Sequence, residues 1–322
     1  MQHSVWIAYL VFIFDLTIRI GLSFRILMRG NTVGVTFAWM SIVLAVPYLG
    51  ALLYLLIGEL RLGEHRLRRA REVIAKSRTW RNALCETAAR QTVNIPPGYQ
   101  SLDVQARKII GYPSLPGNTL TLLSNYQSIF RTLINDISSA QISCTLEFYI
   151  WETGGLADEL LETILEAHAR GVHCRILLDA VGSKNFLRGE PCRRLRQSGI
   201  NITYALHVNA LKMLFQRADI RNHRKIAIID SRIAYTGSQN LVDPRFFKQD
   251  AGVGEWIDLM IRIEGPAVMA LDNVTAMDWS VEAGEAYDFP ISTISMQTIG
   301  DVPVQVVPSG PVFRQGACLL YT

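Results

Sequence analysis

The sequence predicts an α/β sandwich behind an N-terminal hairpin of two membrane helices. Two long apolar segments fill the first 58 residues, and strand-like and helix-like segments alternate from Asn118 onward. No GxGxxG lies between a strand and a helix, which disfavours a Rossmann fold. We therefore expect the α/β sandwich to carry the chemistry and the hairpin to act as an anchor.

Composition excludes several classes of site without choosing a function. The 322 residues carry a formal charge of only +4, and 49% of them are hydrophobic. The five cysteines form no CxxC pair and have no zinc-like spacing with histidine, so neither a structural metal nor a disulfide framework is indicated. We expect no metal and no cofactor.

The second apolar segment is the stronger membrane signal. No charged residue occurs from Gly30 to Gly58, and this length suffices for a helix across a bilayer. Pro47 lies in its middle, where a membrane helix tolerates proline. The first segment, Val5 to Leu27, contains Asp15 and Arg19, whose i,i+4 spacing lets them pair and face the second helix. The expected turn lies around Arg29 to Gly34.

A signal peptide is the alternative for the first segment, but no basic residue precedes it and no small-residue cleavage site follows it. Basic residues instead crowd behind the second segment, which predicts that the body and the N-terminus are cytoplasmic. These residues could also contact anionic headgroups, or simply be solvated. They are Arg61, Arg66, Arg68, Arg69, Arg71, Lys76, Arg78 and Arg81.

We divide the chain into four regions. Residues 1–62 are the anchor, and 63–117 are a basic juxtamembrane region and linker; the linker occupies 82–117 and has a Pro/Gly-rich tail. Residues 118–290 form the first α/β domain, and 291–322 are the stub of a second. Within the first domain we expect strands at 142–151, 171–183, 202–206, 224–229 and 233–236, and helices at 155–170 and 192–197.

The stretch RNHRKIAIIDSRIAYTGSQN, residues 221–240, concentrates polar chemistry. On a strand, positions i and i+2 share a face, so His223 and Lys225 point the same way. A neighbouring ammonium favours a neutral, nucleophilic imidazole and can bind phosphate. Gly237 supports a tight turn whose Ser238 and Asn240 can donate to phosphate oxygens.

Three further acidic residues enter the candidate set. Asp230, at a predicted turn, is grouped with the catalytic residues in a structural or orienting role, because it cannot share the face of His223 on a regular strand. Glu147 could support the histidine, although a cross-strand charge pair explains it equally well. Asp258 is a candidate contact of the active-site strand, and the nearby Trp256 is expected in the core.

The ordered pattern H-x-K-x4-D-x6-G-S-x-N resembles the signature of the phospholipase D superfamily. The flanking segments LEFYIWETGGLADELLETILEAHARGVHCRILLDAVGS and WIDLMIRIEGPAV, with the apolar hairpin, resemble bacterial cardiolipin synthase from about residue 5 to Pro311. The resemblance implies a phosphatidyltransferase that joins two phosphatidylglycerol molecules into cardiolipin in the bacterial inner membrane. It implies that His223 forms a phosphatidyl-histidine while Lys225 and Asn240, helped by Ser238, hold the phosphate, and that no metal is needed.

The chain departs from that family in one respect. Superfamily enzymes pair two HxK motifs, the second histidine protonating the leaving alcohol, whereas His223 begins the only HxK here. DVPVQVVPSGP resembles the opening of a second half, and PVFRQGACLLYT departs from it. We expect a truncated or frame-shifted synthase with impaired activity, with a homodimer or a sequence fragment as alternatives. An inactive membrane remnant and a metal-independent nuclease are the competing functions; we expect no nucleic acid partner.

Overall fold

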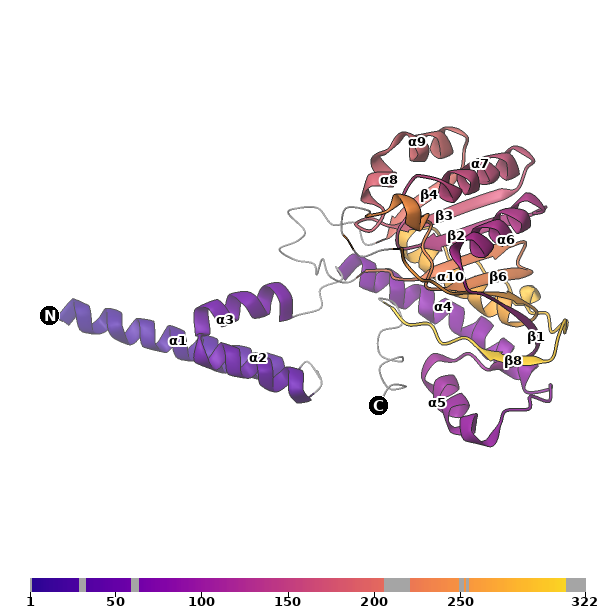
Figure 1. The fold of residues 1–322 in the computed structure, drawn as a ribbon. Helices are drawn as coiled ribbons and strands as arrows, with labels where there is room; N and C mark the ends of the chain where they lie inside the picture. Colours follow the sequence, from indigo (N-terminus) through magenta and orange to yellow (C-terminus); the bar gives the residue numbers. More distant parts are fainter. Residues whose placement is uncertain are drawn as a thin grey trace. The chain divides into compact units, whose positions relative to one another are not determined.

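The computed structural model describes residues 2–28, 33–58, 64–205, 221–248, 252 and 255–310. These form two compact units, one with the N-terminal helices and one with the body from His65 onward. Figure 1 traces both along the sequence.

The N-terminal unit is a helical hairpin whose second arm is broken. α1 (Gln2–Met28) is long and apolar enough to cross a membrane. The expected single second helix is instead α2 (Val33–Ala45), α3 (Pro47–Leu53) and a π-helical turn (Tyr54–Gly58). The break has a local cause, since Pro47 cannot continue the helix and Val46 before it leaves the helical region, with φ of −132° and ψ of 78°.

The charged pair inside α1 faces the second arm, as the sequence predicted. The Arg19 guanidinium lies 2.7 Å from the Asp15 carboxylate and also donates to the carbonyl of Leu44 in α2. Ile26, Val43 and Tyr54 are fully buried between the arms. The turn expected around Arg29 to Gly34 lies largely outside the described residues.

The body is built on a mixed sheet of eight strands in the order β4-β3-β2-β5-β6-β7-β1-β8. β2, β3 and β4 are parallel, and every other neighbouring pair is antiparallel. The strands are β1 (Ser114–Leu123), β2 (Ser143–Phe148), β3 (His173–Asp179), β4 (Asn201–Ala205), β5 (Lys225–Ile229), β6 (Ile233–Gly237), β7 (Met260–Glu264) and β8 (Val302–Gln305).

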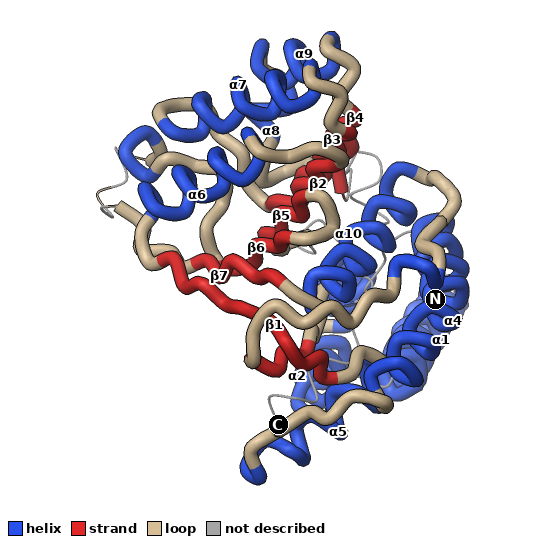
Figure 2. The backbone as a smooth tube through the Cα atoms, turned by 90° about the vertical axis from the view of Figure 1, so that its right-hand side faces the viewer, coloured by secondary structure: helices blue, strands red, loops and turns tan. Residues whose placement is uncertain are grey.

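Helices cover both faces of this sheet, as Figure 2 shows with the strands edge-on. One face carries α6 (Tyr126–Ser138), α7 (Leu156–Ala169), α8 (Lys184–Arg188) and α9 (Glu190–Gln197). The other carries α4 (Glu64–Ala88), α5 (Gln100–Ile110) and α10 (Ala267–Ala283). Short 3-10 turns lie at Pro97–Tyr99, Pro244–Phe246 and Ile291–Thr293. The α/β sandwich expected from the sequence is confirmed.

The predicted elements of the body lie where the periodicity placed them, within a few residues at each end. In α7, Leu156, Leu160, Ile164 and Ala167 are all buried, because i,i+4 spacing puts them on one face. β3 is buried on both faces between parallel neighbours, which explains its continuous apolar run. Leu206, expected at the end of a strand, lies outside the described residues.

The linker expected over 82–117 is wrong, because most of that region is regular structure. α4 continues to Ala88, and its Trp80 and Leu84 belong to the apolar core under α10. α5 follows and ends at Gly111 in the left-handed conformation that glycine favours. The strand at 114–123 includes the Pro-Gly pair. Clustered proline and glycine therefore mark the 3-10 turn at Pro97–Tyr99 and a register shift within β1, not an unstructured tail.

Several basic residues of α4 hold the body together. Arg66 pairs with Glu282, and Arg69 and Arg81 donate to the carbonyls of Val281 and Ile110 at 3.0 and 2.6 Å. The sequence had suggested only headgroup contact or solvation for them. Arg61 lies outside the described residues, as does the tail 311–322.

The segment expected to open a second domain continues the same sheet. β8 pairs with β1 through Ser114–Gln305 and Leu115–Val304. The division of the chain into domains remains a prediction.

Candidate active site

The candidate site forms where the end of β2 meets β5 and the segment after β6. Three consecutive residues organise it: Phe148 pairs with Lys225, Tyr149 stacks on His223, and Ile150 donates its N–H to Asn240. The pairing of β2 with β5 therefore brings together two parts of the motif that are 15 residues apart in sequence.

His223 lies just before β5, exposed on one side and covered by an aromatic ring on the other. The rings of Tyr149 and His223 are nearly parallel, with centroids 4.1 Å apart and an interplanar angle of 16°. Partial burial and then the positive charge of Lys225 lower the pKa of His223 below its usual 6.5. The imidazole is therefore neutral at neutral pH and has a lone pair available for attack.

Lys225 holds its ammonium close to this imidazole. Its Nζ donates to the carbonyl of His223 at 2.7 Å and lies 5.3 Å from the centre of the Tyr149 ring. Burial lowers the pKa of Lys225, and the charge of Asp258 opposes that effect. An ammonium has three N–H groups, so this one bond leaves two for an anion.

Asn240 is oriented by the backbone of β2. Its Oδ1 accepts from the N–H of Ile150 at 3.0 Å, and this bond fixes the orientation of the amide. The NH₂ group on the other side of the amide can then donate to a ligand. The side chain is buried. This preorganised donor suits the phosphate-binding role that the sequence suggested.

Gly237 and Ser238 both contact Leu259, the residue that precedes β7. A Cβ on Gly237 would lie 2.2 Å from the carbonyl oxygen of Leu259, so only glycine fits. The Ser238 hydroxyl accepts from the N–H of Leu259 at 3.0 Å and lies 3.4 Å from its carbonyl oxygen. Both residues thus fix the approach to β7, and phosphate contact by Ser238 remains a prediction.

Asp230 lies at the opposite end of β5 from His223. Seven extended residues span about 23 Å, so its carboxylate does not reach the histidine. It accepts instead from the N–H groups of Gln141, Ile142 and Ser143 at 2.9, 2.7 and 2.8 Å. These bonds fit the orienting role expected for Asp230. Its grouping with the catalytic residues is wrong, because its carboxylate lies far from His223.

Glu147 acts on the neighbours of His223 and not on the ring. It is 1% exposed, accepts from the Asn222 amide at 2.6 Å and lies 3.6 Å from the Arg224 guanidinium. Arg224 also pairs with Asp278 of α10. Burial raises the pKa of Glu147, opposed by Arg224 and by the Asn222 hydrogen bond. Residues on both sides of His223 are therefore held from the α10 face.

The sequence motif did not predict several residues that position the histidine. Asp179 at the end of β3 accepts from the Asn222 N–H at 3.2 Å and pairs with Arg221 at the same distance. Asn222 and Arg224 alternate with His223 and Lys225, so the two-residue period could have placed them on the opposite face. Tyr149 had no spacing signal, because its contact depends on the β2–β5 register.

No three histidine, cysteine, aspartate or glutamate side chains come together in a metal-like group within the described residues.

Comparison with known proteins finds two matching family models and several similar curated proteins. Residues 133–267 match the family described as "Cardiolipin synthase, PLD-like domain", and residues 17–59 match "Phospholipase_D-nuclease N-terminal". Cardiolipin synthase A of Yersinia pseudotuberculosis is 40% identical over 302 residues, and that of Salmonella arizonae is 38% identical over 301. Each alignment covers 92% of this chain and 61% of the relative, so the chain spans less than two thirds of their length.

Among solved structures, NucT from Helicobacter pylori matches with a TM-score of 0.39 at 15% identity, covering 51% of this chain and 98% of that one. The matched residues 133–267 include the HxK motif, which lies where the end of β2 meets the start of β5. The chain therefore carries a phospholipase D-like domain over residues 133–267 and is similar to bacterial cardiolipin synthase A over 92% of its length.

Proposed function

We propose that the chain carries the nucleophilic half of a phosphatidyltransferase that makes cardiolipin from two phosphatidylglycerol molecules. The observation that carries this proposal is the gathering of His223, Lys225 and Asn240 by three consecutive residues of β2 and the segment after it. A neutral imidazole, an ammonium and a fixed amide are what attack on a phosphodiester requires.

In the first step, an imidazole nitrogen of His223 attacks phosphorus. The P–N bond forms as the bond to the headgroup glycerol breaks, and glycerol leaves after taking up a proton. In the second step, a hydroxyl of another phosphatidylglycerol attacks phosphorus, the P–N bond breaks, and the hydroxyl proton is released. The products are cardiolipin and free His223. Lys225 and Asn240 offset the charge on the non-bridging oxygens in both steps.

The departing glycerol must take its proton from an acid. In the superfamily that this chain resembles, the histidine of a second HxK motif is that acid. This sequence contains one such motif. We propose that the acid comes from a second copy of the chain, or from a partner segment corresponding to the part of the relatives that this chain does not span. Without it, the first step is slow and the phosphatidyl-histidine is the readout of choice.

We also propose that the N-terminal hairpin is embedded in the inner membrane with the body in the cytoplasm. α1 is long and apolar enough to span, and basic residues follow the second apolar arm. Both substrates are bilayer lipids, so an anchored body meets them at the surface where they reside.

The test uses the full chain in nanodiscs containing phosphatidylglycerol labelled at phosphorus. We expect a covalent, acid-labile and base-stable phosphatidyl-enzyme that His223→Ala abolishes. Lys225→Ala should slow its formation by about a hundredfold or more, as for loss of one electrostatic donor. His173→Ala is the matched control, because His173 is an exposed histidine at the start of β3.

The proposal would be overturned if the folded chain forms no phosphatidyl-enzyme, either alone or mixed with the portion of a relative that this chain does not span. Metal-independent cleavage of DNA without reaction on lipid would instead support the nuclease hypothesis.

A further inference from the structure

An elongated apolar cavity begins at the candidate site. Its volume is about 450 Å³, within the range of small-molecule sites. It lies between the α10 face of the sheet and the chain segment 304–310. We call it the acyl groove, and its lining includes Leu120, Ile226, Thr236, Ile261, Val274 and Val306.

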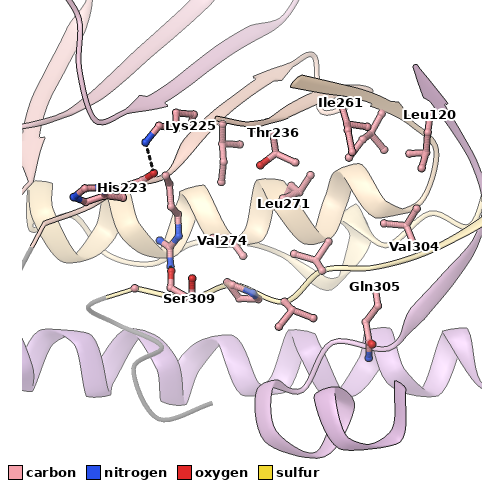
Figure 3. Close-up of a pocket in the computed structure, with 18 of the residues that line it drawn as sticks. Leu120, His223, Lys225, Thr236, Ile261, Leu271, Val274, Val304, Gln305 and Ser309 are labelled. Carbon is pink, nitrogen blue, oxygen red and sulfur yellow. Dashed lines mark hydrogen bonds between the residues drawn. The ribbon is translucent and has the colours of Figure 1, made fainter. Parts of the chain in front are cut away.

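The groove is polar at one end only. Figure 3 shows His223 and Lys225 at one end and Leu120, Ile261 and Val304 toward the other. Gln305 also lines it, but its amide donates to the carbonyls of Asp103 and Tyr112 at 3.1 and 3.0 Å. A ligand that fills the groove therefore has an apolar tail and a polar group near the histidine.

The charges at the mouth favour an anionic head. Arg221 and Arg224 line the groove but are paired, with Asp179 and with Asp278 and Glu147 respectively. Lys225, in contrast, donates one hydrogen bond to a neutral carbonyl and retains two N–H groups. A phosphate at His223 thus meets the ammonium directly.

The walls disfavour polypeptide and nucleic acid. The strands that form the roof, β5, β6, β7 and β1, are hydrogen-bonded to one another in register, so their backbones offer little to an added strand. Bases would require aromatic platforms, and the described lining contains no phenylalanine, tyrosine or tryptophan. A hydrocarbon chain needs neither.

We propose that the acyl groove receives one acyl chain of the glycerophospholipid whose phosphate is attacked by His223. This rests on the proposed function and adds to it a binding site for the lipid tail. The groove would draw one chain out of the bilayer while the phosphate is held at the mouth, which would set the position of phosphorus relative to the imidazole.

The first test is photolabelling, which needs no turnover. Phosphatidylglycerol with a diazirine at the end of one acyl chain is incorporated into nanodiscs with the full-length His223→Ala chain. We expect label on peptides containing Leu120, Ile261 or Val304, whereas a diazirine close to the acyl carbonyl should label near Lys225. Label confined to the N-terminal helices, or independent of the diazirine position, would overturn the acyl groove.

A matched pair of variants tests the far end of the groove. Leu120 and Leu122 share one face of β1 and are 38% and 64% exposed, but only Leu120 lines the groove. We expect Leu120→Trp to suppress far-end labelling at least tenfold and Leu122→Trp to leave it unchanged. Equal labelling in both would contradict the proposal, and thermal unfolding checks that each variant is folded.

Kinetics with short-chain, monomeric phosphatidylglycerols provide an independent measurement. Each methylene that enters the groove should lower KM roughly fourfold, so dioctanoyl lipid should exceed dihexanoyl lipid in apparent affinity. Leu120→Trp should flatten this dependence, whereas Leu122→Trp, outside the groove, should leave it unchanged. Chain-length dependence that survives Leu120→Trp would contradict the groove, whereas loss of phosphatidyl-enzyme with intact far-end labelling would contradict only the proposed chemistry.

Discussion

The histidine and lysine of the site were predictable residue by residue, and their surroundings were not. Alternation along a strand placed His223 and Lys225 on one side, and the structure keeps them together through the Lys225 Nζ bond to the His223 carbonyl. The Tyr149 stack and the Asp179 bond to Asn222 come from distant parts of the chain. Nothing in local spacing specifies such contacts, because they depend on strand register.

Asp230 provides the clearest prediction at this scale. Burial alone would raise its pKa, but the three backbone N–H groups from 141–143 outweigh burial and lower it. The folded state therefore favours the ionised form. This stabilisation is fully present above the unfolded pKa of about 3.9 and is lost as pH falls through the lower folded pKa.

We expect Asp230→Asn to lower the free energy of unfolding by about 1–3 kcal/mol at neutral pH, since a charged acceptor is lost. Asparagine tolerates the positive φ of 53° found there, so the substitution isolates the carboxylate. The gap to wild type should shrink as pH falls through the folded pKa in urea titrations. The exposed Asp301→Asn is the control, and identical acid profiles for Asp230→Asn and wild type would contradict this role.

At the scale of elements, the sequence predicted the parallel half of the sheet better than the antiparallel half. β3 and α7 have clear periodicity, whereas α4 and α5 were read as juxtamembrane and linker segments because charge and Pro-Pro-Gly dominate their composition. Their apolar residues are sparse, and their role in the core depends on α10. Trp80 and Leu84 of α4 are buried in the same apolar core as the residues of α10. Composition alone does not reveal that tertiary partner.

Removing one member of the buried polar contact between β2, the segment before β5 and α10 should strongly destabilise the fold. Glu147→Leu removes the acceptor for Asn222 and one counter-charge of Arg224, leaving a buried cation incompletely paired. We expect a loss of about 3–5 kcal/mol in urea denaturation, as when one partner of a buried ion pair is removed. Glu147→Gln keeps an acceptor for Asn222 and should lose less. Equal stability of Glu147→Leu and wild type would show that the network adds nothing net.

At the scale of the whole molecule, two units with different surfaces share one chain. The N-terminal unit leaves large apolar side chains such as Trp6, Phe12 and Phe24 more than 60% exposed, while the body buries two apolar cores, one on each face of its sheet. A lipid environment removes the cost of the exposed apolar surface. The apolar helices were therefore predictable from composition, although the break at Pro47 was not.

Cysteine labelling tests the orientation of this anchor. In a chain carrying Cys85→Ser and Cys318→Ser, we expect Arg29→Cys to react with a membrane-impermeant maleimide in intact cells, because the proposed two spans would place the turn outside. His65→Cys should react only after permeabilisation. The remaining cysteines Cys144, Cys174 and Cys192 are buried and provide a low background. Labelling of His65→Cys in intact cells would reverse the topology.

The stacked Tyr149 ring also gives His223 a magnetic signature. An aromatic ring with its centroid 4.1 Å away and nearly parallel shields the imidazole protons, so their NMR resonances should lie upfield of those of unstacked histidines. The chain has only six histidines, so a histidine-selective isotope label gives a spectrum that can be assigned by substitution. The chemical shift of one side chain would then follow ionisation, phosphate binding and covalent modification within a single sample.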